Sequence, residues 1–296
     1  MSERAQALSA SRPGPRRFVG FGRLLSSPAG AAGSIALLIL AVVAALAPVI
    51  APFDPLAQIA FPFDGFSARH LLGTDELGRD ILSRIIYGLR LSLVTAVSTA
   101  LLAAVLGVAI GLVAGYFGGW IDGITMRVMD VVLSVPAILL AIVLVAIMGG
   151  GIVPLIIAIA IVGVPAFARL TRASVLSVKE REYVSAQRAA GASTGDIILR
   201  TVLPNVLGPA VVQLTVTAST AVLTESGLNF LGLGTAPPAP SLGSMLAAGN
   251  ENLFMSPVYP VVVGFAIALL VATFDAFGAG LQRVVGGSAR RGGVVA

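Results

Sequence analysis

Five long runs without a charged residue limit what this chain can fold into. About 20 apolar residues, each rising about 1.5 Å in a helix, cross a hydrocarbon core roughly 30 Å thick. The third run has 38 residues and is interrupted by Gly149, Gly150, Gly151 and Pro154, so we interpret it as two spans with a tight turn. The sequence therefore predicts six transmembrane helices. The five runs cover positions 31–51, 91–121, 131–168, 201–224 and 252–274.

The composition agrees with a membrane protein. Hydrophobic residues make up 57% of the 296 residues and charged residues 11%, with a mean hydropathy of +0.98, whereas soluble domains carry about 25% charge. The chain has no cysteine, which excludes disulfides, thiolate metal sites and cysteine nucleophiles. The single histidine, His70, has no second soft ligand beside it, and we interpret it as an interfacial hydrogen-bonding residue and not a metal ligand.

The chain lacks the lysine of a phosphate-binding loop. Its only lysine, Lys179, stands between Val178 and Glu180, whereas a P-loop needs Gly-Lys followed by Ser or Thr. The chain therefore cannot be a P-loop ATPase.

Basic residues are distributed unevenly among the segments between the spans. Fifteen of the 19 lie in the N-terminal tail, near Arg127, in the segment 169–200 and in the C-terminal tail. The other four lie in the segment 53–90. The positive-inside rule places the fifteen, and both termini, in the cytoplasm. The outward segments 53–90 and 225–257 then carry a net charge of −3, and the spread of the arginines argues against nucleic-acid binding.

The first apolar run has a rival interpretation as a cleaved signal peptide. An arginine-rich front and small residues at Ala45 and Ala47 fit that pattern. The run is longer than the usual 7 to 15 residues, roughly, of a signal peptide, and Pro48, Val49 and Ile50 continue it. We favour a retained helix.

The span interiors offer packing residues and a mildly polar stripe. Gly107, Gly111 and Gly115 share one helical face, which favours close approach of a neighbouring helix. No span centre holds an ionisable residue, which argues against a proton- or ion-coupled carrier. A stripe on the fifth predicted span either lines a translocation path or packs by hydrogen bonds. It consists of Gln213, Thr215, Thr217 and Ser219.

The segment 181–205 is polar in a chain that is otherwise apolar. The spacing predicts a short helix with a small face, a break at Gly191, and a second helix that Ser193 and Asp196 cap as a capping box. Leu203 and Pro204 then restart the chain as a new span. A helix resting on lipid would carry bulky residues, so the alanines favour docking to a protein.

At these residues the chain resembles a known family. EYVSAQRAAGAS followed by LRTVLPN is similar to the EAA loop of bacterial binding-protein-dependent ABC importers, the coupling helix that seats in a groove of the ATPase. The general pattern is matched at Ala186, Gly191, Leu203 and Pro204. The chain departs from it at Ser185, Gln187 and Thr201, where its form is nearer to the peptide and nickel branch.

Two further blocks resemble C-type permease subunits of dipeptide, oligopeptide and nickel importers. The first is HLLGTDELGRDILSRIIYGLRLSL at 70–93, whose charges we expect on a surface helix, with ion pairs such as Asp80 with Arg84. The second is LNFLGLGTAPPAPSLGSMLAAG at 228–249, with Leu242 where the family usually has tryptophan. Asp275 and Ala279 also replace the usual Asn and Asp, so the resemblance specifies the substrate less well than the fold.

The resemblance implies an all-α membrane protein, a type I ABC importer permease with a five-helix core, an N-terminal helix and a cytoplasmic coupling helix. It implies a basic cytoplasmic tail at 1–30, a permease domain at 31–283 that includes a coupling segment at 180–204, and a cytoplasmic tail at 284–296. The chain would reside in the bacterial plasma membrane, in contact with lipid. The residues implied for ATPase coupling are Glu182, Tyr183, Ala186, Arg188, Ala189, Gly191, Ala192, Ser193, Asp196, Leu203 and Pro204.

The resemblance also implies the partners. The chain would be a non-catalytic half of a pathway for peptides, with Gln213 and Thr217 as candidate path residues. A second permease subunit would form the other half, and two ATPase subunits, or a fused pair, would bind ATP and Mg. An extracytoplasmic binding protein would deliver the substrate. Import of nickel or another small solute is the alternative within the family, and a stand-alone channel or secondary carrier is the alternative from another class.

Overall fold

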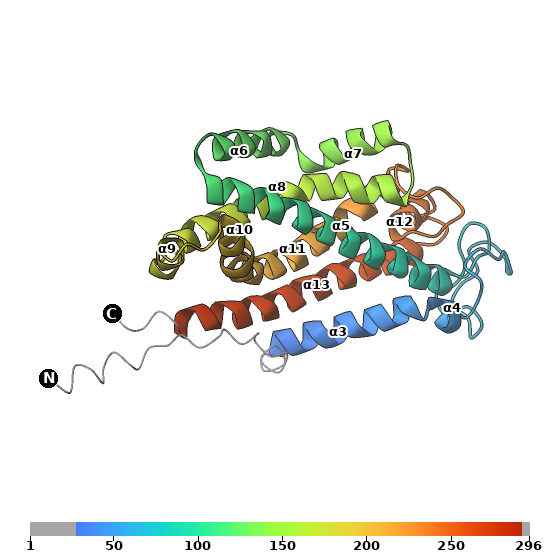
Figure 1. Ribbon diagram of the computed structural model, residues 1–296. Coiled ribbons are helices and arrows are strands. Elements are labelled where there is room, and N and C mark those ends of the chain that lie inside the picture. The colour runs from blue at the N-terminus through green and yellow to red at the C-terminus, as the bar shows by residue number, and fades with distance from the viewer. Residues whose placement is uncertain (1–27, 292–296) are drawn as a thin grey trace.

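The computed structural model describes residues 28–291, and the regular elements among these residues are all helices (Figure 1). The predicted tail at 1–30 therefore lies almost wholly outside the described residues. In chain order the helices are α3 (Pro28–Ala45), α4 (Ala47–Ile50), α5 (Ile81–Phe117), α6 (Gly119–Ser134), α7 (Ala137–Met148), α8 (Ile152–Lys179), α9 (Glu182–Ala189), α10 (Thr194–Asp196), the π-helix η1 (Ile197–Val202), α11 (Leu203–Phe230), α12 (Leu242–Glu251) and α13 (Val258–Arg291).

Four helical stretches are long and apolar enough to cross a membrane, namely 81–117, 152–179, 194–230 and 258–285. Helices α6 and α7 pass the same test only as a pair, with a bend of 92° between them, and would make a fifth span. Helix α3 is apolar but shorter. The all-helical fold class is confirmed, and the number of six spans stays a prediction.

The long third run folds differently from our expectation in its first half. The predicted turn is present, because Gly149 and Gly151 have φ angles of 83° and 128° between α7 and α8. We expected one straight helix to begin near residue 131, and this was wrong, because the chain bends between α6 and α7. Pro136 ends α6, since a proline disfavours helical geometry at the preceding residue, and α7 has only 12 residues.

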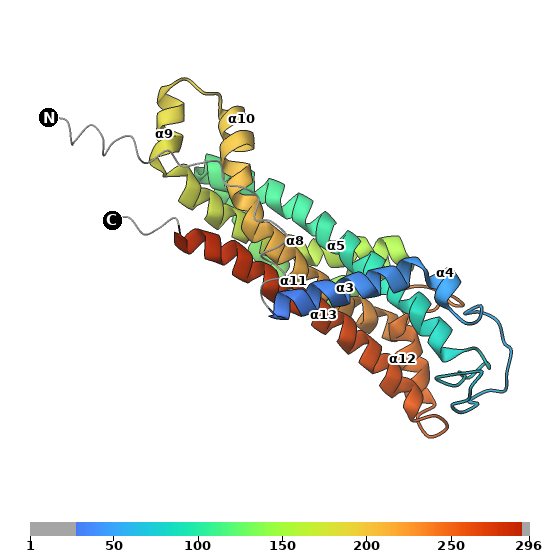
Figure 2. The ribbon, with the colours of Figure 1, turned by 90° about the horizontal axis from the view of Figure 1, so that it is seen from below.

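The long helices α5, α8, α11 and α13 form the centre of the bundle (Figure 1). Helix α3 packs on α13 at one flank, and α6 and α7 pack on α5 and α8 at the other. Helices α9 and α10 project from one end, which we name the α9 end (Figure 2). The segment 51–80 and α12 lie at the opposite end, which we name the loop end.

Glycines on α5 allow α8 to approach closely. A methyl group on Gly107 would lie 2.4 Å from Phe167 Cβ, and one on Gly111 would lie 2.4 Å from the carbonyl oxygen of Ala168. Both distances are far below van der Waals contact, so only glycine fits without a shift of the helices. The structure thus confirms the packing interpretation of this glycine face.

Four charged residues of the block 70–93, namely Asp75, Arg79, Asp80 and Arg84, are buried, and our expectation of a surface helix there was wrong. Gly73 and Gly78, with φ angles of 77° and 71°, fold the segment into turns, and α5 begins only at Ile81. Asp80 caps α5 by accepting a hydrogen bond of 2.8 Å from the Ser83 N–H, so it is not free to pair with Arg84.

The partner of Arg84 is Asp75. The distance from Arg84 Nε to Asp75 Oδ2 is 3.2 Å, and the same oxygen accepts a 2.6 Å hydrogen bond from Arg79 Nε. His70 is only 2% exposed, and its Nδ1 lies 3.0 Å from Asp80 Oδ1. It is therefore a buried hydrogen-bonding residue, and its position at a membrane interface stays a prediction.

Candidate functional site

The segment between α8 and α11 forms the α9 end and contains the predicted coupling residues. Helix α8 ends at Lys179, whose Nζ donates a 2.9 Å hydrogen bond to the carbonyl oxygen of Gly115 near the end of α5. Helix α9 begins three residues later and has eight residues. The ends of α5 and α8 are thus joined at the base from which α9 projects.

Helix α9 is attached to the bundle by one buried apolar side chain. Val184 is fully buried among residues of α5, α8, η1 and α11. Arg188 adds a contact with α5, because its guanidinium carbon lies 5.5 Å from the centre of the Tyr116 ring. The residues that form this cluster with Val184 are Leu112, Val175, Val178, Ile197, Val202 and Val206.

A side-chain hydrogen bond links α9 to η1. Thr201 Oγ1 donates to Gln187 Oε1 across 2.9 Å. Both residues are positions at which the sequence departs from the general family pattern, and the structure brings them together. Sequence reasoning treated the two departures separately and missed this contact, as it missed Val184. The simultaneous departure at 187 and 201 was the available signal.

Gly191 ends α9 through its backbone conformation. Its φ is 83°, the left-handed region that glycine adopts without cost. The Ala192 N–H donates to the Gln187 carbonyl and the Gly191 N–H to the Arg188 carbonyl, both at 3.0 Å, which is a Schellman motif. A methyl group on Gly191 would meet nothing within 4 Å, so conformation and not space requires glycine here.

Ser193 caps the second helix as expected. The Asp196 N–H donates a 3.1 Å hydrogen bond to Ser193 Oγ, and this hydroxyl donates to Asp196 Oδ2 at 2.7 Å. Helix α11 begins at Leu203 with Pro204 in its first turn, as expected, but the second helix runs into it without a break. Helices α10, η1 and α11 are continuous from Thr194 to Phe230.

The π-helix η1 lies immediately before Pro204. A proline ring crowds the carbonyl group four residues earlier and offers no N–H, and the wider π register relieves this crowding. The Leu203 N–H donates to the Ile198 carbonyl, five residues back. Any force on α10 therefore reaches α11 through a helix without a break.

Most of the predicted coupling residues are exposed, and we name the exposed residues of the segment 180–204 the α9 surface. Leu203 is half-buried. Among the larger side chains of this surface, Tyr183 is 40% exposed and Leu199 is 64% exposed. The surface combines small residues with two apolar side chains, which suits docking into a groove of another protein. Its other predicted members, all exposed, are Glu182, Ala186, Arg188, Ala189, Gly191, Ala192, Ser193, Asp196 and Pro204.

The two candidate path residues lie on α11 one turn apart. The distance from Gln213 Nε2 to Thr217 Oγ1 is 3.4 Å. Gln213 is half-buried, and Thr217 is 9% exposed and packs against α8, where a methyl group on Gly163 would lie 3.4 Å from its Cγ2. Thr217 therefore serves helix packing within this chain, and the role of both residues in a path stays a prediction.

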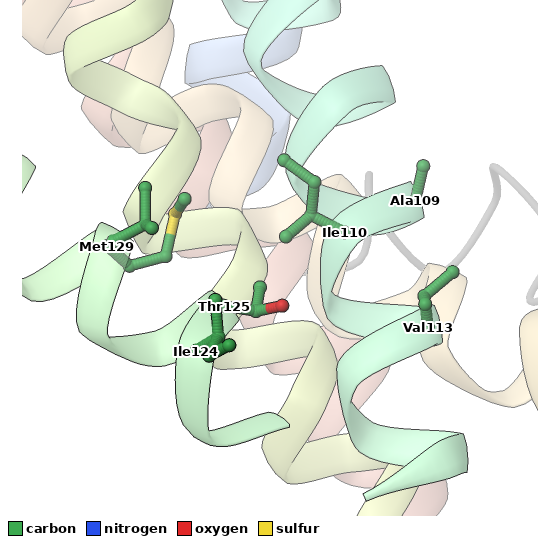
Figure 3. A pocket seen from close by; sticks show the side chains of 7 residues that line it. Ala109, Ile110, Val113, Ile124, Thr125 and Met129 are labelled. Carbon is green, nitrogen blue, oxygen red and sulfur yellow. The ribbon is translucent and has the colours of Figure 1, made fainter. Parts of the chain in front are cut away.

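An apolar groove of about 460 Å³ lies between α5 and α6 (Figure 3). Thr125 supplies its one side-chain hydroxyl group, and the lining has no charged side chain. Among the described residues, no group of three or more His, Asp or Glu side chains is arranged to hold a metal ion. The lining of the groove therefore consists of apolar side chains and the single hydroxyl group of Thr125. Its lining residues are Ala109, Ile110, Val113, Ile124, Thr125, Val128 and Met129.

The chain matches one protein family and several known proteins over most of its length. The family model described as "Binding-protein-dependent transport system inner membrane component" matches residues 107–291. The di/tripeptide transport system permease protein DppC of Pseudomonas aeruginosa (strain UCBPP-PA14) is 41% identical over 261 residues, which cover 86% of each protein. The dipeptide transport system permease protein DppC of Haemophilus influenzae is 40% identical over 257 residues, covering 84% of this chain and 87% of that protein.

A third relative and a solved structure extend the comparison. The glutathione transport system permease protein GsiD of Escherichia coli O1:K1 is 40% identical over 249 residues, covering 83% of this chain and 82% of that protein. A chain of the MetNI methionine ABC transporter in an inward-facing conformation matches with a TM-score of 0.58 and 19% identity, covering 69% of this chain and 97% of its own length. That likeness shows the fold.

Proposed function

The chain belongs to the family of binding-protein-dependent transport system inner membrane components, and from this premise we propose that it forms half of the membrane pathway of an ATP-driven importer of short peptides. The three relatives of about 40% identity carry the peptide assignment. They are named for the transport of di- and tripeptides, dipeptides and glutathione, and glutathione is itself a tripeptide. Nickel import is the alternative that the experiment must test.

The shape of the α9 end supports coupling to a separate ATPase. Helix α9 contacts its own chain through few side chains, chiefly Val184, Gln187 and Arg188, and its remaining surface is exposed. The continuous helix from Thr194 to Phe230 would carry a push on this surface into the bundle. ATP and Mg would bind to two ATPase subunits or a fused pair, and this chain would do no catalysis.

The positions of the helix ends support the proposed topology. The start of α3 and the end of α13 point toward the α9 end of the bundle (Figure 1), so both termini would be cytoplasmic if that end is. Counting α3 and the bent pair α6–α7 as spans gives the six crossings of a permease domain at 31–283. Helix α13 continues to Arg291, past the boundary proposed for the C-terminal tail at 284–296.

Uptake into vesicles tests the substrate. The chain, co-purified with its second permease subunit, ATPases and binding protein, is reconstituted and supplied with labelled dipeptides, tripeptides, glutathione and Ni²⁺. We expect ATP-dependent uptake of the peptides. Uptake of Ni²⁺ alone would replace the peptide assignment, and uptake at the same rate without the ATPases would show a stand-alone carrier or channel.

A substitution on α9 tests the coupling surface. Ala186 is exposed, so Ala186→Trp leaves the packing of this chain intact while obstructing a groove that receives α9. We expect the variant to lose ATP-driven uptake. Gly123→Trp on α6 is the matched control, because Gly123 is exposed as well and a Cβ at that position meets nothing within 4 Å. Normal uptake by an assembled Ala186→Trp complex would exclude docking through this face.

Gly191 offers a second test with a different mechanism. A bulky residue there has space but must adopt a φ of 83°, which costs roughly 1–2 kcal/mol for a residue with a Cβ. The turn between α9 and α10 would distort, and uptake would fall in an assembled complex. If uptake stays normal, the geometry of this turn does not carry the coupling.

A further inference from the structure

A buried carboxylate lies inside the third long span of the bundle. Glu225 belongs to α11 and is fully buried, although we had counted it with an outward segment. Ionisable side chains inside membrane spans are rare and costly, so their partners indicate a function. Ser92 Oγ of α5 donates to Glu225 Oε2 at 2.8 Å, and Asn229 Nδ2 donates to Glu225 Oε1 at 2.6 Å. The carboxylate therefore joins α5 to α11.

The hydrogen bonds around Asn229 have a fixed direction. Its Oδ1 accepts from the Thr235 N–H at 2.8 Å and from Thr235 Oγ1 at 3.0 Å. A backbone N–H can only donate, so the amide oxygen must face Thr235 and the amide nitrogen must face residue 225. The amide nitrogen donates to two acceptors of residue 225, the backbone carbonyl at 3.0 Å and the carboxylate at 2.6 Å.

Further contacts link this region to the next loop and to the turn before α8. The Gly151 N–H donates to the Gly234 carbonyl across 3.1 Å. A methyl group on Gly234 would lie 2.1 Å from Asn229 Oδ1, and one on Gly243 of α12 would lie 2.1 Å from the Ser226 carbonyl oxygen. Asn229 therefore contacts the loop 231–241 and the start of α12, where a methyl group on Gly243 would also lie 2.7 Å from Asn229 Cβ, and the loop in turn bonds to the α7–α8 turn.

We propose that Glu225 is a positioning residue for transport, which acts through Asn229 to hold the loop 231–241 and the α7–α8 turn against α5 and α11. The elements at this end would then move as one body when the pathway opens. The role in transport rests on the proposed function, and the attachment itself does not. One of the two positions must carry an acid and the other an amide, because Thr235 needs an acceptor at residue 229 and the contact between residues 225 and 229 needs one donor and one acceptor.

Exchanging the acid and the amide tests this pairing. In Asn229→Asp alone, two carboxyl groups face each other at the 2.6 Å contact and can stay in contact only by sharing one proton. The variants are therefore compared at an alkaline pH that ionises both groups, where neither can donate and the attachment fails. In the double variant Glu225→Gln with Asn229→Asp, the glutamine amide donates to the new carboxylate at position 229. The second oxygen of that carboxylate accepts from Thr235, and Ser92 donates to the glutamine oxygen. The total charge and the approximate volumes are unchanged.

Spin labels report the attachment independently of transport. The chain has no cysteine, so Met148→Cys at the end of α7 and Ala239→Cys in the exposed loop place one label on each side of the contact. We expect one narrow distance distribution in the parent complex, a broad one in Asn229→Asp and recovery in the double variant. Asn252→Asp is the matched control, because the Asn252 amide donates only to its own helix, at the Ala248 carbonyl.

Uptake is measured on the same complexes. We expect Asn229→Asp to reduce uptake roughly tenfold, as loss of a buried hydrogen bond to a charged group implies, and the exchange to restore most of it. If Asn229→Asp prevents assembly, recovery of assembled complex in the double variant is the readout. A double variant no better than Asn229→Asp, or an unchanged distance distribution in Asn229→Asp, would overturn the proposal. Recovery of the distances without peptide uptake in the parent complex would contradict only the proposed function.

Discussion

The two ends of the bundle carry polar residues in opposite ways. At the loop end, Asp75 and Asp80 are at most 1% exposed, and their partners belong to this chain. At the α9 end, the ion pair of Asp196 with Arg200 has side-chain exposures of 52% and 83%. The buried charges of the loop end are therefore paired within this chain, whereas the α9 end leaves most of its polar and small residues exposed. The difference indicates that the charges of the loop end hold its own fold together, while those of the α9 end contribute little to it.

Among the substitutions that test this difference between the two ends, we expect the largest effect at Asp75. Asp75→Asn keeps one oxygen but places an NH₂ group against Arg79 and Arg84, two buried guanidinium groups. Breaking a buried ion pair from one side costs about 3–5 kcal/mol. We expect the segment 53–80 to lose protection from hydrogen exchange, measured by mass spectrometry.

Asp54→Asn is the matched control for Asp75. Asp54 lies in the same segment, is exposed, and accepts a 2.8 Å hydrogen bond from the Leu56 N–H through Oδ1, which asparagine retains. We expect no measurable change in exchange. Equal protection in the two variants would mean that the buried cluster does not hold the loop end together.

A smaller effect is expected at the contact between α9 and η1. Thr201→Val keeps the shape of the side chain and removes the hydroxyl that donates to Gln187, a loss of about 1 kcal/mol. Because Val184 still anchors α9, the complex should assemble, and uptake per ATP hydrolysed should fall. The measurement is the ratio of the two rates in the reconstituted complex.

Thr220→Val provides the comparison for Thr201. Thr220 is exposed on α11, and its hydroxyl donates only to the Val216 carbonyl of its own helix. The same substitution there should leave the ratio unchanged. If both variants behave alike, the link between α9 and η1 has no part in coupling.

Features set by neighbouring residues were predicted from the sequence. The apolar runs predicted the helical class, Gly191 predicted the break in the segment 181–205, and Ser193 predicted the cap, because each depends on groups within a few residues. The Gly107 and Gly111 face also predicted close packing, because small residues at four-residue spacing act in the same way in any helix pair.

Features set by distant residues were not predicted. The partner of Arg84 is Asp75 only because Gly73 and Gly78 fold the chain back, and helical spacing suggested Asp80 instead. Glu225 looked like a boundary residue because its partner Ser92 is 133 positions away. The contact of Gln187 with Thr201 likewise needs the turn between α9 and η1 to be known first.

The smallest effect on stability is expected at Arg200. Its Nε lies 3.4 Å from Asp196 Oδ1 on the exposed face of the continuous helix, and an exposed pair at this spacing contributes about 0.3–0.5 kcal/mol. Arg200→Ala should leave thermal unfolding nearly unchanged and leave the Ser193 cap intact. A double-mutant cycle with Asp196→Ala measures the pair energy in the isolated chain and again in the complex with its ATPases. We expect the two values to differ, since a docked partner would exclude water from a pair that is now mostly exposed. Equal values would mean that this part of the α9 end stays in solvent in the assembled transporter, and the docking surface would then be limited to α9 itself.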